Sequence, residues 1–169
     1  MYPKLLARDL GIAAVAVLAW RLAAPWSAGS GAVADFSGLL LGLLVGACAF
    51  LAHEWGHLLG ALAAGGQVQP AASLRSPFVF NFDSRASSRR QFLIMSFAGF
   101  AATGVGLWFA YALLPSELLA TRVARGAIVF LAFLGVVLEV PLVVYSLVSR
   151  KVPPVGVAPS ERPAERAAA

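Results

Sequence analysis

Two histidines and a glutamate occur within five residues of an apolar segment, in the order His53-Glu54-Trp55-Gly56-His57. On an α-helix, residues four apart lie nearly above one another, so both imidazoles can reach one metal ion while Glu54 lies beside them. Catalytic zinc takes three protein ligands and leaves a fourth position for water, whose proton a neighbouring carboxylate can accept. The spacing therefore predicts Zn²⁺ held by His53 and His57, with Glu54 as the general base of a hydrolase.

The composition predicts an integral membrane protein, since 60% of the 169 residues are hydrophobic and only 12% are charged. Long uncharged runs, each near or above the ~20 residues that a bilayer requires, predict spans at about 10–26, 36–64, 92–114 and 126–148. The expected fold is an all-α four-transmembrane-helix bundle that forms one membrane domain over 1–148. Residues 149–169, rich in proline, alanine and charge, are expected to form a disordered cytoplasmic tail.

The basic residues of the short connections predict the orientation in the membrane. Those that can share one side are Lys4, Arg8, Arg75, Arg85, Arg89, Arg90, Arg150 and Lys151. Arg122 and Arg125, between the third and fourth spans, oppose this assignment. We expect a multi-pass protein of the cell membrane with both termini in the cytoplasm, although the first span also fits a cleaved signal peptide. The net charge of +5 then reflects topology and the anionic lipid bilayer, with no nucleic-acid partner.

Small residues share a helix face with the histidines of the second span. Within about 100° of arc lie Gly42, Gly46, Ala49, His53, Gly56, His57 and Gly60. Small residues let helices approach closely in lipid, so this face is expected to point into the bundle, where polar ligands are tolerated. The third span carries a similar row, Ser96, Gly99, Thr103, Gly106 and Ala110. That row indicates packing, not chemistry.

Glu139 is the only acidic residue of the last span, and a carboxylate inside a membrane suggests a functional site. At 1.5 Å of rise per residue, His57 lies roughly 10 Å, Glu139 roughly 13 Å and His53 roughly 16 Å from the cytoplasmic ends of their spans. The matching depths predict Glu139 as the third metal ligand. The alternative is a protonated glutamic acid that is hydrogen-bonded to a neighbour.

The loop between the second and third spans contains two short extended candidates, 68–74 and 78–82. They predict a short β-hairpin-like loop in which Phe80, Asn81 and Phe82 bind substrate. A transmembrane helix hides its amides in its own hydrogen bonds, so it must unwind before hydrolysis, and an exposed strand edge can hold it extended. The alternative is an interfacial hairpin that only plugs the mouth of the cavity.

Residues 36–148 resemble the site-2 protease family of intramembrane zinc metalloproteases. The segment His53-Glu54-Trp55-Gly56-His57-Leu58-Leu59-Gly60 is similar to that family's metal helix. Gly65-Gly66-Gln67-Val68 resembles its turn into a short β segment, and Phe97-Ala98-Gly99-Phe100 resembles the start of its next helix, where Ala-Gly-Pro is usual. The resemblance implies a zinc endopeptidase that cleaves membrane-protein substrates.

One departure from the family's pattern concerns the third ligand. Its third core helix usually carries Asn-x-x-Pro and then Asp-Gly, whose aspartate binds zinc. Aligning that proline with Pro141 puts Leu138 at the asparagine and Ser146-Leu147 at Asp-Gly. Three possibilities therefore remain open: Glu139 substitutes, Asp83 from the loop supplies the ligand, or the site is incomplete.

Two functions follow from these observations. The first is an intramembrane zinc metalloprotease that hydrolyses peptide bonds in or near the transmembrane segments of membrane proteins. The second is a catalytically inactive relative that binds a partner or substrate helix. Metal transport is less consistent with the sequence, because two histidines and one acid in four spans offer few stepping sites for an ion. The sequence identifies neither the substrate, the cleavage site nor the oligomeric state.

Overall fold

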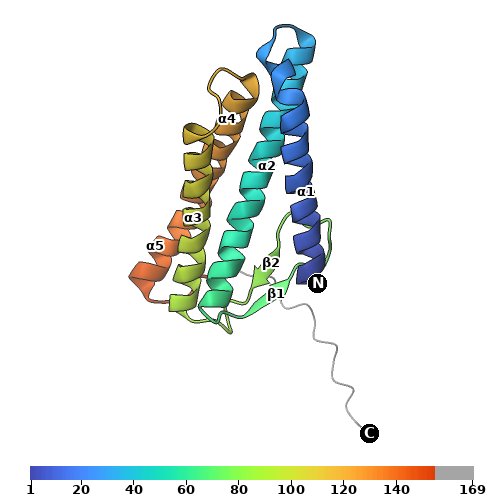
Figure 1. The fold of residues 1–169 in the computed structure, drawn as a ribbon. Helices are drawn as coiled ribbons and strands as arrows, with labels where there is room; N and C mark the ends of the chain where they lie inside the picture. The colour runs from blue at the N-terminus through green and yellow to red at the C-terminus, as the bar shows by residue number, and fades with distance from the viewer. Residues whose placement is uncertain (155–169) are drawn as a thin grey trace.

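The computed structural model describes residues 1–154, and this part of the chain is mostly helical (Figure 1). In chain order the elements are α1 (Tyr2–Ala23), the 3₁₀ helix η1 (Ala24–Ala28), α2 (Ala32–Ala63), β1 (Val68–Pro70), β2 (Phe80–Phe82), α3 (Arg89–Ala112), α4 (Leu119–Leu134), the π turn η2 (Gly135–Glu139) and α5 (Val140–Ser149). Most of the tail predicted for 149–169 lies outside the described residues, which end at residue 154.

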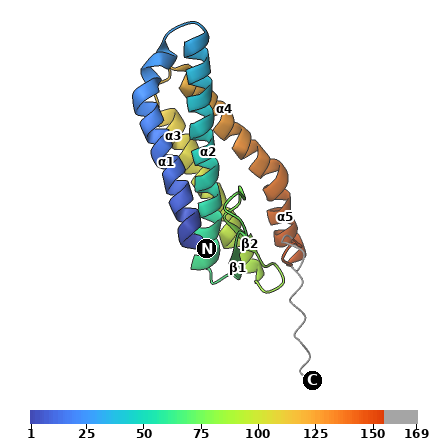
Figure 2. The same ribbon diagram turned by 90° about the vertical axis from the view of Figure 1, so that its right-hand side faces the viewer.

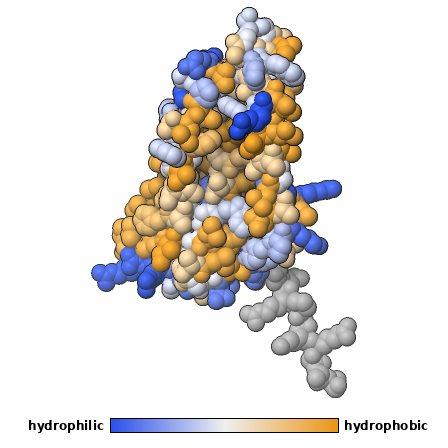
Figure 3. All heavy atoms as spheres, in the orientation of Figure 1, coloured by the Kyte–Doolittle hydropathy of each residue, from blue (hydrophilic) through white to orange (hydrophobic). Residues whose placement is uncertain are grey.

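Three helical segments are long and apolar enough to cross a membrane: Ala32–Ala63, Arg89–Ala112 and Leu119–Ser149. They correspond to the predicted spans 36–64, 92–114 and 126–148, the last of which begins seven residues earlier than expected. Apolar side chains, orange in Figure 3, cover much of the molecule's flanks. A mostly helical protein suited to a membrane is thus confirmed. The predicted span at 10–26 is not among the three, because α1 begins at Tyr2, carries Arg8, Asp9 and Arg21, and gives way to η1 at Ala24.

The helix α2 packs against α1 on one side and against α3 and α4 on the other (Figures 1 and 2). Gly38, Gly42 and Gly46 face α4, whereas Gly56 and Gly60 face α3. A Cβ on Gly46 would lie 2.6 Å from the Cβ of Ala127, and one on Gly56 would lie 2.9 Å from the Ala98 carbonyl oxygen. The small residues of α2 therefore serve two neighbours, and both helices approach its backbone closely.

A two-stranded antiparallel sheet joins α2 to α3. Its register pairs Val68 with Phe82, Gln69 with Asn81 and Pro70 with Phe80. The strands are shorter than the predicted segments 68–74 and 78–82, but the hairpin-like loop between the helices is present. Figure 2 shows α4 and α5 diverging from α2 toward this end of the molecule, with the hairpin between them.

A partly buried ion pair ties α1 to both the hairpin and α2. The Arg8 guanidinium donates hydrogen bonds to the carbonyls of Leu74 and Ser76, at 2.7 and 2.6 Å, and to the Asp9 carboxylate at 2.6 Å. Asp9 also accepts a hydrogen bond of 2.9 Å from the Trp55 indole. Because Trp55 follows Glu54 directly, this network fixes the rotation of α2 at the residue next to the predicted base.

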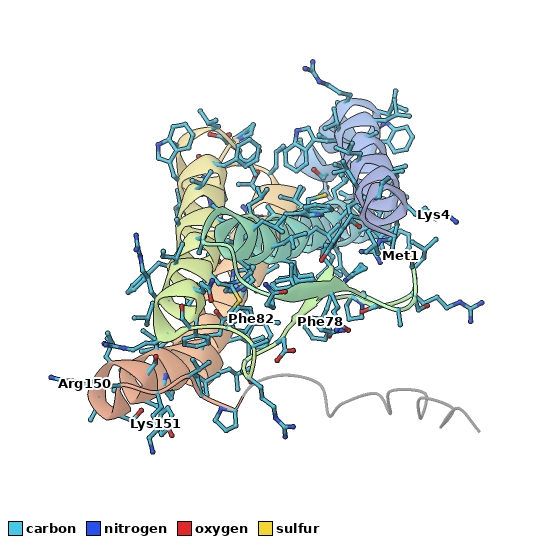
Figure 4. All side chains as sticks on the ribbon, turned by 90° about the horizontal axis from the view of Figure 1, so that it is seen from below. Met1, Lys4, Phe78, Phe82, Arg150 and Lys151 are labelled. Atoms are coloured by element: carbon cyan, nitrogen blue, oxygen red, sulfur yellow. The ribbon has the colours of Figure 1, made fainter. Side chains whose placement is uncertain are left out.

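Both ends of the described chain lie at the hairpin end of the molecule, on opposite sides of it (Figure 4). Figure 4, a view from below, shows Lys4, Arg150 and Lys151 at this end. After α5, Arg150 adopts the left-handed conformation (φ 58°), and Val152 packs against an apolar cluster that includes Phe82 and Val143. The first residues of the predicted tail thus pack against the hairpin end of the bundle.

The contact between α2 and α4 can be tested at Gly42. A Cβ there would overlap the Val123 side chain and lie 2.7 Å from the Ala120 carbonyl oxygen, so Gly42→Ala should cost about 1–3 kcal/mol of stability. The matched control is Gly104→Ala, because no atom lies within 4 Å of a Cβ at Gly104. Thermal unfolding in detergent should show a lowered midpoint for the first variant only. Equal unfolding midpoints for the two variants would contradict the close approach of α4 to α2 at Gly42.

Candidate metal centre

The hydrogen bonds of the two imidazoles define which of their nitrogens are free. His53 Nδ1 lies 3.1 Å from the Gly99 carbonyl oxygen, and His57 Nδ1 lies 3.0 Å from the Met95 carbonyl oxygen. A carbonyl oxygen can only accept, so each Nδ1 carries the proton and donates it. In the neutral imidazoles the lone pairs are then on Nε2, which is the arrangement that metal-binding histidines adopt.

Both Nε2 atoms converge on the Glu139 carboxylate. His53 Nε2 lies 3.1 Å from Glu139 Oε1, His57 Nε2 lies 3.2 Å from Oε2, and the two Nε2 atoms are 3.0 Å apart. One ligand atom from each of the three residues lies within 4.8 Å of the others. Two nitrogen ligands at about 2.1 Å from a tetrahedral zinc ion would be about 3.4 Å apart. The cluster is therefore close to the size that such an ion requires, and these three residues could hold a metal ion.

Because the cluster is largely buried, placing two Nε2 lone pairs beside a carboxylate costs free energy unless a proton or a metal ion lies between them. His53 is only 3% exposed and its α2 neighbour Glu54 only 8%, while the Glu139 side chain is 29% exposed. From the hairpin ends of their helices, His53 and Glu139 both lie about 15 Å along the axis. Two nitrogen lone pairs and a carboxylate that face one another in an apolar interior repel unless a proton or a cation lies between them.

A cavity of about 540 Å³ opens beside this cluster. It is lined by Glu54 and His57 from α2, by Glu139, and by Phe80, Asn81 and Phe82 from β2. Figure 4 shows Phe78 and Phe82 on the hairpin beneath the helices. The structure thus brings the predicted base, two of the predicted ligands and the predicted substrate-binding residues to one cavity, which has the volume of a typical ligand site.

Asp83, the alternative third ligand, and Ser146, which aligns with the family's aspartate, do not join the cluster. Asp83 accepts hydrogen bonds from the backbone N–H groups of Arg85 and Ala86, at 2.9 and 3.1 Å, and so forms the turn that follows β2. Among the described residues, Asp83 does not belong to the three-residue group that could hold a metal ion. Ser146 lies two turns beyond Glu139 on α5 and is fully buried. Of these candidates, only Glu139 is within reach of both imidazoles.

The row of small residues on α3 was predicted to serve packing alone, and this was wrong for two of its members. Gly99 supplies the carbonyl that fixes His53, and the Thr103 hydroxyl lies 2.8 Å from the same Nδ1. A Cβ on Gly99 would also overlap the imidazole of His57. The sequence did offer one sign of this role: Thr103, a hydrogen-bonding residue, follows Gly99 by four residues and so lies on the same inward face of the helix. The sequence does not show which helix meets the histidines.

Comparison with protein-family models, with curated proteins and with solved structures finds no match to this chain. Its function is therefore inferred from the geometry of its own residues.

The role of Gly99 can be tested by metal binding. Gly99→Ala should displace the His57 ring and lower the affinity for Zn²⁺ by at least about tenfold, since residues that orient metal ligands typically contribute 10–100-fold. Gly104→Ala, on the same helix with open space around it, is the control. Zinc affinity is measured by competition with a chromogenic chelator. An unchanged affinity in Gly99→Ala would show that the ring does not need this space.

Proposed function

We propose that this chain is an intramembrane zinc metalloprotease that hydrolyses peptide bonds in or near the transmembrane segments of other membrane proteins. The observation that carries the proposal is the convergence of two imidazole Nε2 atoms and one carboxylate on a single point, beside Glu54 and an apolar cavity. The same activity is implied by the resemblance of residues 36–148 to the site-2 protease family. Zn²⁺ is the proposed ion because two histidines and a carboxylate form a common catalytic zinc ligand set.

In this proposal the protein holds the ion by His53, His57 and Glu139. A bound zinc ion would lower the pKa of a coordinated water and polarise the carbonyl of the scissile bond. The Gly99 and Met95 carbonyls keep both imidazoles in the tautomer that offers Nε2. Because these acceptors belong to the backbone of α3, the ligand geometry is set before a substrate arrives.

Glu54 is the proposed general base. It lines the same cavity as His57 and Glu139, so it borders the space from which a water molecule would approach the metal position. It would accept the proton of the attacking water and then pass it to the amine that leaves. The Trp55–Asp9 hydrogen bond supports this role by fixing the adjacent residue.

The outer edge of β2 is the proposed site where an unwound substrate is held. Asp83 N donates to Gln67 O, and Ala71 N donates to Val79 O. Hydrogen-bonded pairs alternate in an antiparallel ladder, so the N–H and C=O groups of Phe80 and Phe82 point away from β1. An extended peptide could pair with that edge beside Glu54 and His57. On β1, Pro70 lacks an N–H group and so weakens the opposite edge.

The proposed setting is the cell membrane, with α1 as a fourth crossing and both termini in the cytoplasm. At 1.5 Å per residue α1 is about 33 Å long, which suffices to span the ~30 Å hydrocarbon core. Its charged residues lie in its first eight residues and at Arg21, and two of them, Arg8 and Asp9, are paired. The hairpin-end location of Lys4, Arg150 and Lys151 supports a cytoplasmic hairpin. The partners would be the lipid bilayer and a membrane-protein substrate.

A second candidate function is a catalytically inactive membrane protein that binds a partner or substrate helix. It is favoured by the short distances between Glu139 and both Nε2 atoms, because protons could satisfy the same three side chains without a metal. The absence of the Asp-Gly pair from the last span also supports it. A cleavage assay beside metal analysis separates the two functions, since bound zinc without turnover favours the inactive protein and zinc-dependent proteolysis excludes it.

The base assignment is tested with Glu54→Gln. This variant should retain one zinc ion per chain but lose at least about 10²-fold in the rate of cleavage, the usual contribution of a general base. The assay uses single-span membrane proteins in liposomes, and a chelator should abolish cleavage by the wild type. Full activity of Glu54→Gln would exclude Glu54 as the base, and chelator-resistant cleavage would exclude the metal mechanism.

The proposed strand edge is tested at Phe80. Phe80→Pro removes an N–H group that does not serve the β1–β2 ladder, whereas Phe80→Leu keeps it and removes only the ring. Cleavage should fall at least about tenfold further in the proline variant than in the leucine variant, because backbone pairing supplies the affinity. Bound zinc should remain in both. Equal cleavage by the two variants would contradict a backbone role for this edge.

A further inference from the structure

The helix that carries Glu139 changes its hydrogen-bond pattern at that residue. From Gly135 to Glu139 the chain forms a π turn, in which the Val140 N–H donates to the Gly135 carbonyl five residues before it. The segments on either side, α4 and α5, are ordinary α-helix. A π turn of this kind amounts to one extra residue inserted into an α-helix, and such turns are rare and frequently occur at functional sites.

Pro141 explains why the turn is here. A proline inside an α-helix has no N–H group to donate, and its ring clashes with the carbonyl four residues earlier, which is that of Val137. Pro141 lies in the first turn of α5, directly after the π turn. The wider turn moves the preceding carbonyls away from the ring, so the helix continues past the proline without ending.

The faces of α4 show what the extra residue does to Glu139. One face meets α3: Ile128 lies 3.8 Å from a Cβ position on Gly106, and a Cβ on Gly135 would lie 3.8 Å from the Phe100 ring. In a continuous α-helix, Glu139 would follow Gly135 by four residues and would stay on this α3-facing row. Its Cα–Cβ bond would then be directed at α3.

A second face of α4 meets α2, through Leu119, Val123 and Ala127. Counted at about 100° per residue from Leu119, this row covers about 80°, and Glu139 would lie at about 200° in an uninterrupted helix. One extra residue reduces that angle by about 100° and turns Glu139 toward the histidines of α2. In a regular helix the position at about 100° would belong to Leu138.

We propose that Pro141 is a positioning residue: the π turn that it imposes rotates Glu139 from the α3-facing row to the histidine pair and so completes the metal site. This inference rests on the proposed metal site and adds the device that delivers its third ligand. Pro141 itself need not touch the ion. It acts through the register of the helix.

The test compares zinc affinity in four purified full-length proteins: wild type, Pro141→Ala, the exchange Leu138→Glu/Glu139→Leu, and the exchange combined with Pro141→Ala. Removing the proline should restore a regular α-helix and turn Glu139 away, so affinity should fall at least about tenfold. The exchange alone should also bind weakly, because residue 138 does not face the site when the π turn is present. The combined protein should recover affinity to within about threefold of the wild type.

A second readout is the visible absorption of Co²⁺ bound in place of zinc, which reports the ligand set independently of cleavage. The wild type and the combined protein should share a spectrum, whereas the other two should differ from it. Equal zinc affinity in wild type and Pro141→Ala would overturn the inference while leaving the metal site in place. Failure of the combined protein to recover would also overturn it. A wild type that binds no zinc would remove the proposed metal site and this inference with it.

Discussion

The hydrogen bonds from two imidazole N–H groups to backbone carbonyls of α3 are the constraint on which the rest of this site depends. They use up Nδ1 of His53 and His57 and leave both Nε2 lone pairs directed at one point and at Glu139. Water relieves that arrangement only in part, because it reaches Glu139 from the cavity but hardly reaches His53, and the surrounding helices are apolar. A cation is the simplest group that makes such a cluster favourable.

These hydrogen bonds require α2 and α3 to approach closely, and glycine makes this possible. Gly56 and Gly60 on α2 leave room for the backbone of α3, and Gly99 on α3 leaves room for the His57 ring. The helix α2 also packs against α4 through a separate set of glycines, while the hydrogen bond between Trp55 and Asp9 anchors its remaining side to α1. The central helix is thus held from three directions, and the candidate base, ligands and hairpin meet at its hairpin end.

Much of this could be predicted from local sequence. The period of the helix put His53, Glu54 and His57 together, and counting residues from the ends of two spans brought Glu139 to the same depth. The supporting carbonyl of Met95 and the roles of Gly99 and Thr103 could not be predicted, since they depend on which helix packs against α2. The π turn was missed for a different reason. Pro141 signalled a disturbance of the helix, but only the packing on both sides of α4 shows in which direction the helix is rotated.

The central claim is that His53, His57 and Glu139 bind a zinc ion inside the membrane domain. X-ray absorption at the zinc edge of the purified, detergent-solubilised protein measures the number and type of its ligands. The account predicts one zinc ion per chain with two imidazole nitrogens at about 2.0–2.1 Å and oxygen ligands completing a four-coordinate site. A protein that retains no zinc, or a zinc spectrum without imidazole scattering, would contradict it.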